Sequence, residues 1–223
     1  MKKITSLMMT LLFIFSTIAV PVYAAELPEV NTYAGAIDIL DVVNNPEKYP
    51  DLKITIHRTA ADFVEHLYED TNMSQSERDD IISTVAATPA VCGSSYTGYV
   101  TVNDYASIKD GYAVNPYFYC QVSASDPNIY NITSFNTILW GNIDRDCNGL
   151  VKEFSGTLSY NLEAYNRLFW DLNGTFYDTG TTTWVINASA NLGGGAGSVG
   201  FAVGGEGSYF AYKHIMDYIV FNI

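Results

Sequence analysis

The stretch LVKEFSGTLSYNL, residues 150–162, alternates apolar and polar side chains and decides the fold class. The even positions carry the apolar residues Leu150, Phe154, Leu158, Tyr160 and Leu162. The odd positions carry Glu153, Ser155, Thr157, Ser159 and Asn161. A period of two is typical of a strand with one face against a core and the other in water.

The same period extends from Tyr96 to Ile223, where aromatic and β-branched residues alternate with Thr, Ser, Asn and Gly. In WDLNGTFYD, the dipeptide Asn173-Gly174 separates two such runs and predicts a two-residue hairpin turn. We therefore predict a mainly β fold of about seven to nine strands, an antiparallel β-sandwich or small barrel with a short α-helical N-terminal segment.

The helical pattern lies between about Thr32 and Thr88. Apolar residues recur at helical spacing in three runs: Ile37, Leu40 and Val43; Phe63 and Leu67; and Ile81, Ile82 and Val85. The second run follows Thr59, with Asp62 three residues on, and the third follows Ser74, with Glu77 three residues on; both spacings are typical of a helix N-terminus. Such short helices are suited to covering the edge of a sheet.

The chain opens with two lysines, an apolar run from Leu7 to Val20 and a proline at Pro21. This pattern predicts a secretory signal peptide, residues 1–24, cleaved after Ala24. We expect a helical N-terminal segment over 25–92 and an antiparallel β domain over 93–223. The MKK start indicates a bacterial protein, which we expect to be secreted, extracellular and without a transmembrane anchor.

Of the 223 residues, 48% are hydrophobic, which is enough to build a sizeable core. Removing the two signal-peptide lysines leaves nine basic residues against 24 acidic ones, so the formal charge moves from -13 to -15. This balance, without any run of Lys or Arg, excludes nucleic acid as a partner and disfavours anionic membranes.

Three cysteines, Cys92, Cys120 and Cys147, lie in the β-rich part of the chain. An odd count allows at most one internal disulfide, so we expect one cysteine to stay unpaired. Of the three, Cys120 is the best candidate for a bridge because it lies within an alternating strand, and the pairing is open. The absence of C-x-x-C spacing gives a zinc site no support.

A glycine-rich stretch, residues 191–207, contains Gly195-x-Gly197-x-x-Gly200, the spacing of a dinucleotide-binding fingerprint. That fingerprint needs a strand before its glycines and a helix after them. Here alternating strand patterns lie on both sides, with Trp184, Ile186, Ala188 and Ala190 on one face before the glycines and Val199, Phe201 and Val203 after them. We therefore predict that residues 193–197 form a hairpin connection and that no nucleotide cofactor binds.

The segment DRDCNG places Asp144, Asp146, Asn148 and Gly149 at the first positions of a calcium-binding loop. The closing position falls on Ser155, which cannot supply two oxygens, and Glu153 lies two residues too early. We predict a hairpin tip at Asn148-Gly149 and no metal; calcium binding by this loop is the alternative.

Nucleophilic chemistry has little support in the sequence. CGSSYTG misses the G-x-S-x-G spacing by one residue. Cys92 could act as a thiol nucleophile only if His57, His66 or His214 served as its base. We predict no catalytic residue, and an extracellular hydrolase with a Cys92 or carboxylate centre is the third functional hypothesis.

Aromatic residues are frequent, with 17 Tyr, 11 Phe and three Trp. GYAVNPYFYCQV places Tyr112, Tyr117 and Tyr119 around one strand, and exposed tyrosines suit both sugar stacking and protein recognition. The leading hypothesis is a non-catalytic protein that binds carbohydrate or protein at its surface. The second is a membrane-active protein, pore-forming or bacteriocin-like, that inserts the uncharged hairpin 179–205.

Overall fold

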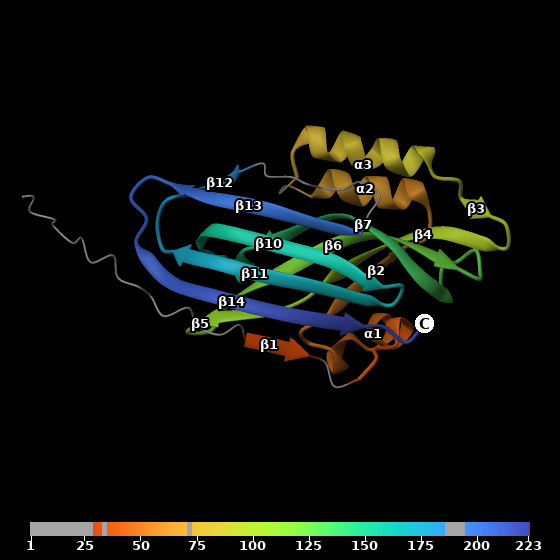
Figure 1. Cartoon of the computed structure of the whole chain (residues 1–223), viewed down its shortest axis with the longest axis horizontal. Coiled ribbons are helices and arrows are strands. Elements are labelled where there is room, and N and C mark those ends of the chain that lie inside the picture. The colour runs from red at the N-terminus through yellow and green to blue at the C-terminus, as the bar shows by residue number, and fades with distance from the viewer. Residues whose placement is uncertain (1–28, 33–34, 71–72, 186–194) are drawn as a thin grey trace, which may run out of the picture.

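The computed structural model describes residues 29–32, 35–70, 73–185 and 195–223. The segment predicted to be a signal peptide lies outside these residues, as do residues 186–194 of the uncharged hairpin. The fold is mainly β, as predicted, and is built from two large sheets, antiparallel except at one edge strand, with a helical layer (Figure 1). The described residues from Ser95 onward form eleven strands, more than the seven to nine predicted, because several of them are short edge or hairpin strands. No helix among the described residues is long and apolar enough to cross a membrane.

The first sheet, called the C-terminal sheet, has the strand order β1-β14-β11-β10-β13-β12. Its strands are β1 (Glu29–Thr32), β10 (Glu153–Ala164), β11 (Arg167–Tyr177), β12 (Thr181–Val185), β13 (Ala196–Gly204) and β14 (Tyr209–Val220). All neighbours pair antiparallel except β1, which runs parallel to β14 with Glu29 opposite Ile215.

The second sheet, called the helix-covered sheet, is centred on β6 (Tyr112–Ala124). One edge of β6 pairs with β4 (Ser95–Asn103) and β5 (Ala106–Lys109), and β6 also pairs with β7 (Ile132–Asp144). β2 (Lys53–His57) and β3 (Val91–Cys92) pair with β4. Both β2 and β3 belong to the segment expected to be helical, so this segment also supplies strands to the sheet.

The core lies between the two sheets. Its largest fully buried members include Phe118 on β6 and Phe154, Trp170 and Phe176 on the C-terminal sheet. Phe118 meets Tyr160 of β10 edge to face, with ring centroids 5.6 Å apart. The two inner faces therefore pack together in a sandwich arrangement.

The helices α2 (Ala60–Glu69) and α3 (Gln75–Ala87) lie side by side along one side of the sandwich (Figure 1). Thr59 caps α2, and Ser74 and Glu77 form a capping box on α3, as predicted. Their buried residues join a second core with Tyr99, Tyr117, Tyr119, Leu139 and Trp140 of the sheet. The helices therefore cover the outer face of this sheet, not merely an edge.

The first helix, α1 (Ile39–Asn44), precedes the 3-10 turn Pro46–Lys48. α1 buries Ile39 and Val42, whereas Val43 of the predicted apolar run is exposed. The predicted face was wrong because the packing surface of so short a helix is set by where its neighbours lie. Ile37, from the same run, is buried before the helix in a parallel bridge to Phe221.

The predicted hairpin turn at Asn173-Gly174 is wrong, because β11 runs through both residues and pairs on both sides. The turn between β10 and β11 falls at residues 165–166 instead. Gly174 lies opposite Gly156, and a Cβ added to Gly174 would lie 2.6 Å from the ring of Phe154. This glycine makes room for an aromatic ring inside a central strand.

Strand β10 confirms the alternation of residues 150–162 from Glu153 onward, with Phe154, Leu158 and Tyr160 buried. Leu150 departs from it, since it lies in the separate two-residue strand β9 (Leu150–Val151) and its side chain is 48% exposed.

Candidate functional site

A cavity of about 330 Å³, called the α2 pocket, lies between α2 and the outer face of the helix-covered sheet. The residues that line it come from α2 and its C-cap, from β4 and β6, and from the end of β7: His66, Glu69, Asp70, Thr101, Asn103, Tyr117, Tyr119 and Asp144. Every one of them carries a polar group. The volume is at the lower end of the range of small-ligand sites.

Asp70 organises the back of this pocket. The hydroxyls of Tyr117 and Tyr119 both donate to its Oδ2, at 2.9 and 3.0 Å. The amide Nδ2 of Asn142 donates to the Tyr117 hydroxyl at 3.1 Å. The backbone carbonyl of Asp70 accepts a bond from Arg78 of α3 at 3.0 Å, which fixes the C-terminus of α2. The two hydroxyls therefore hold the carboxylate of Asp70, and Arg78 holds its backbone.

Burial raises the pKa of both tyrosines, and the negative charge of Asp70 raises it further. Tyr117 and Tyr119 consequently stay protonated and act as donors at any physiological pH. A bound ligand would meet a fixed array of hydroxyls and carboxylate oxygens.

Two histidines lie at the pocket: His66 lines it, and His57 contacts the lining residue Thr101. His57 of β2 is buried, and its Nε2 lies 2.8 Å from the Thr101 hydroxyl, while its ring centroid lies 4.8 Å from that of His66. Burial, followed by the proximity of His66, lowers the pKa of His57 to about 4, so His57 is neutral at pH 7. It orients Thr101, whereas His66 lines the pocket itself.

The three tyrosines considered for a ligand-binding face are buried, as aromatic residues that merely suit a β-sheet would be. Tyr112, Tyr117 and Tyr119 are only 2%, 5% and 2% exposed. Tyr117 and Tyr119 lie under the helices, and Trp140 packs against both rings. Tyr112 faces the opposite core and donates to the Arg145 carbonyl. Tyr117 and Tyr119 offer no stacking surface because α2 and α3 cover them, and Tyr112 offers none because its ring packs against Phe176 and Phe210.

The glycine-rich fingerprint is part of a sheet. Gly197 and Gly200 lie in β13, which pairs with β10 and β12, so a strand follows the glycines as predicted. A Cβ added to Gly197 would lie 2.5 Å from the Cε2, Cζ and hydroxyl oxygen of Tyr160. The absence of a side chain at this glycine therefore leaves space for the Tyr160 side chain in the core. The hairpin connection predicted at residues 193–197 is wrong at its end, because Ala196 and Gly197 already belong to β13 and pair with β10; residues 193 and 194 lie outside the described residues.

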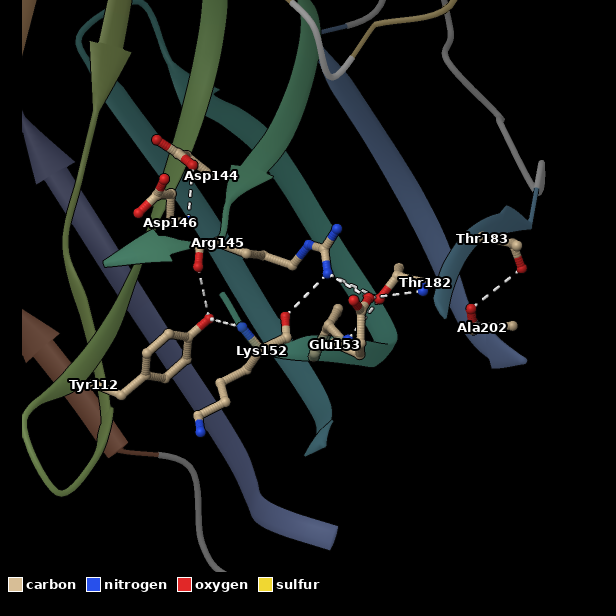
Figure 2. Close-up of polar contacts among 10 residues, drawn as sticks. Tyr112, Asp144, Arg145, Asp146, Lys152, Glu153, Thr182, Thr183 and Ala202 are labelled. Carbon is tan, nitrogen blue, oxygen red and sulfur yellow. Dashed lines mark hydrogen bonds and ion pairs between the residues drawn. The ribbon is translucent and has the colours of Figure 1, made fainter. Parts of the chain in front are cut away.

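The DRDCNG segment forms a small hairpin of β8 (Asp146–Cys147) and β9 (Leu150–Val151), with Asn148 and Gly149 at the tip. Both tip residues have positive φ, 56° and 83°, as a type I′ turn requires. Asp144 and Asp146 accept backbone N–H bonds within the loop, and Figure 2 shows the first of these. The predicted turn is confirmed. Among the described residues, no group of three or more His, Cys, Asp or Glu is placed to hold a metal ion.

Arg145 points away from this hairpin, toward Glu153 and Thr182 (Figure 2). Its Nη1 lies 2.9 Å from each of three oxygens, those of the Lys152 carbonyl, the Glu153 carboxylate and the Thr182 hydroxyl. The Thr182 N–H donates to the same Glu153 oxygen at 2.7 Å. These bonds connect the β8–β9 hairpin to β10, and they also connect the edge strand β12 to β10. The cluster therefore stabilises the fold.

The residues suggested for nucleophilic catalysis are dispersed. The backbone of Cys92 lies in β3, whose turn leads into another strand at Ser95, not into a helix as a nucleophile elbow requires. His214 lies in β14 of the other sheet, 3.1 Å from Asp171. Cys120 and Cys147 are free thiols, so the predicted bridging of Cys120 is wrong. Cys120 faces the core, where apolar residues surround it.

A scan against protein-family models and searches of the curated proteins and of the solved structures found no match. The α2 pocket is therefore the basis for a proposed function. Of its eight lining residues, the sequence pointed to Tyr117 and Tyr119 as ligand-binding tyrosines, and to His66 and Asp144 for a catalytic base and a calcium loop. Thr101 and Asn103 lie two residues apart on β4 and therefore on the same face of the strand. This spacing of polar residues was the one feature of the sequence that indicated a polar face there.

Proposed function

We propose that the protein is an exported, non-catalytic bacterial binding protein that takes a saccharide into the α2 pocket. The observation that carries the proposal is the Asp70 carboxylate, fixed by two tyrosine hydroxyls within a pocket lined entirely by polar residues. The export half of the proposal rests on the signal-peptide pattern of residues 1–24.

A saccharide suits this pocket because each sugar hydroxyl both donates and accepts a hydrogen bond. The lining supplies acceptors on Glu69, Asp70 and Asp144 and groups of both kinds on Thr101 and Asn103. A site built to satisfy hydroxyls rejects ligands that lack them, since its polar groups would then be desolvated without partners. Because the tyrosine rings are buried, recognition would rely on hydrogen bonds, with little ring stacking.

The proposal is tested by saturation-transfer NMR and calorimetric titration of the mature protein against a panel of neutral, acidic and amino monosaccharides and disaccharides. We expect one or more of these to bind with a dissociation constant in the micromolar to millimolar range, and Asn103→Leu to weaken the binding at least tenfold. Glu163→Gln, on the other sheet, is the matched control and should bind as the wild type does.

Two outcomes would overturn the saccharide proposal. One is that no sugar in the panel binds to protein whose fold is confirmed by circular dichroism. The other is binding that Asn103→Leu leaves unchanged, which would place the sugar elsewhere. Amino-terminal sequencing of protein recovered from the medium tests export separately, with Ala25 expected as the first residue.

A further inference from the structure

Two carboxyl groups meet in the interior, between the sheets. Asp104 lies at the junction of β4 and β5, and Asp217 lies in β14, with exposed fractions of 0% and 2%. Burying two negative charges side by side is costly, and carboxylates this close avoid the cost by sharing a proton.

The neighbouring donors show which group holds that proton. Asp104 accepts bonds on both oxygens, from the Tyr105 N–H at 2.9 Å and from the Trp170 Nε1 at 2.8 Å. Asp217 accepts one backbone bond, from the Tyr218 N–H at 2.6 Å, and its side chain is hydrogen-bonded to Asp104. Two carboxylates cannot hydrogen-bond to each other without a proton, so the neutral Asp217 donates to the charged Asp104.

We infer that Asp104 and Asp217 hold one proton between them in the folded protein, and that this proton fastens β14 of one sheet to the β4–β5 junction of the other. The proton-binding site is independent of the proposed saccharide binding.

Charged groups on the surrounding elements have other partners. Lys109 of β5 lies 3.8 Å from Asp110, and Lys213 of β14 pairs with Glu29 of β1. On the outer face of the C-terminal sheet, Asp171 of β11 pairs with His214. Arg167 of β11 pairs with Glu163. The tyrosines of β6 donate hydrogen bonds to other groups: Tyr112 to the Arg145 carbonyl, and Tyr117 and Tyr119 to Asp70.

Burial first, and the charge of Asp104 second, raise the pKa of Asp217 to about 8 from 3.8. An acid whose pKa is higher in the folded state stabilises that state below its unfolded pKa. The stabilisation then declines as pH rises toward the folded pKa. The loss of this proton from Asp217 on unfolding should therefore raise the equilibrium constant for unfolding by about tenfold per pH unit between roughly pH 4 and pH 8.

The test compares urea unfolding of the wild type and Asp217→Asn at half-unit steps from pH 5 to pH 9. The asparagine amide donates to Asp104 at every pH. The ratio of the wild-type unfolding constant to that of the variant should therefore rise about tenfold per pH unit and level off near pH 8. The control Asp110→Asn changes an exposed acid in a turn. The ratio of the wild-type unfolding constant to that of this control should not change with pH. A flat ratio for both Asp217→Asn and Asp104→Asn would overturn the inference.

Asp104→Asn tests which group holds the proton. Its amide would face two N–H donors, so the variant should be less stable than the wild type below about pH 8, where the wild type keeps the shared proton. If Asp104→Asn, and not Asp217→Asn, removes the pH dependence, the assignment is reversed. Should the variants fail to fold, carboxyl ¹³C NMR of the wild type decides. We expect one buried aspartate to titrate near pH 8, and its absence would refute the shared proton.

Discussion

The ring of Tyr160 occupies the space that a side chain at Gly197 would need, and on its other side a Cβ at Gly141 would lie 2.6 Å from it. Gly197→Ala should therefore destabilise the protein by about 1 to 3 kcal/mol through overpacking. Gly204→Ala, in the same strand, meets no atom nearer than 3.9 Å and should change stability by less than about 0.5 kcal/mol. Chemical denaturation measures both. Equal effects would mean that the Tyr160 ring is not confined there.

Glu153→Gln should cost about 1 to 3 kcal/mol at pH 7, because Arg145 loses its charged partner in a partly buried cluster. Burial raises the pKa of Glu153, but the Thr182 bonds and the Arg145 charge outweigh it and bring the pKa below 4.5. A lowered pKa stabilises the folded state above the unfolded pKa, and this contribution is lost as pH falls below about 4.5. Urea unfolding at pH 7 and pH 3.5 should show the difference shrinking at the lower pH. A constant difference would contradict the ionic account.

Between about pH 4 and pH 6.5, the effect of His57 on folding stability should offset the effect of the proton shared by Asp104 and Asp217. Its pKa is about 4 when folded and 6.5 when unfolded, so its contribution is present above pH 6.5 and is lost as pH falls toward 4. Asp217 acts in the opposite direction. Wild-type stability should be nearly level from pH 5 to 6.5 and then fall toward pH 8. The stability of His57→Gln, whose side chain can keep the bond to Thr101, should fall throughout the range from pH 5 to pH 8. A plateau that persists in the variant would contradict this prediction.

Thiol labelling should separate Cys120 from Cys147. Burial raises the pKa of the Cys120 thiol, and this side chain is fully enclosed, so an aromatic disulfide reagent should leave it unmodified in the native protein. Cys147 is partly exposed and should react. Peptide mapping before and after denaturation assigns each site, with Cys120→Ala as the control. Native reaction at Cys120, or its recovery in a disulfide, would contradict the core placement.

We expect no dye release from neutral or anionic liposomes at micromolar protein. In the described part of the uncharged hairpin, Val199 and Phe201 are buried in the core, and exposing them would cost several kcal/mol by a rough area estimate. The formal charge, -13 for the full chain, also opposes approach to anionic lipid. Release that is lost on Ala188→Asp, a change on the apolar side of the alternating run before the glycines, would favour the membrane-active hypothesis over the binding one.

Sequence reasoning succeeded where local chemistry decides structure. The caps at Thr59 and Ser74 and the alternation around Leu158 depend on near neighbours alone. The dipeptide Asn-Gly shows the limit: it forms a hairpin tip at residues 148–149 but lies inside a central strand at 173–174. Only the distant partners Gly156 and Phe154 distinguish the two cases.

The α2 pocket was beyond prediction for a related reason. Asp70, Asn103 and Tyr117 lie on three elements, and no spacing in the sequence links them. The tyrosines were recognised as a group, but the strand pattern could not show that two helices would cover them. The acidic pair was equally hidden, since Asp104 and Asp217 stand more than a hundred residues apart.

The parallel pairing of β1 with β14 has a mechanical consequence. Tension applied through the residue before Glu29 and the residue after Val220 would act along both strands in opposite directions. All the hydrogen bonds between the two strands would then share the load in shear, instead of breaking one at a time as in a hairpin that is peeled open. A protein tethered at one terminus and pulled at the other would first yield at this short edge, leaving the antiparallel strands β10, β11 and β14 in place.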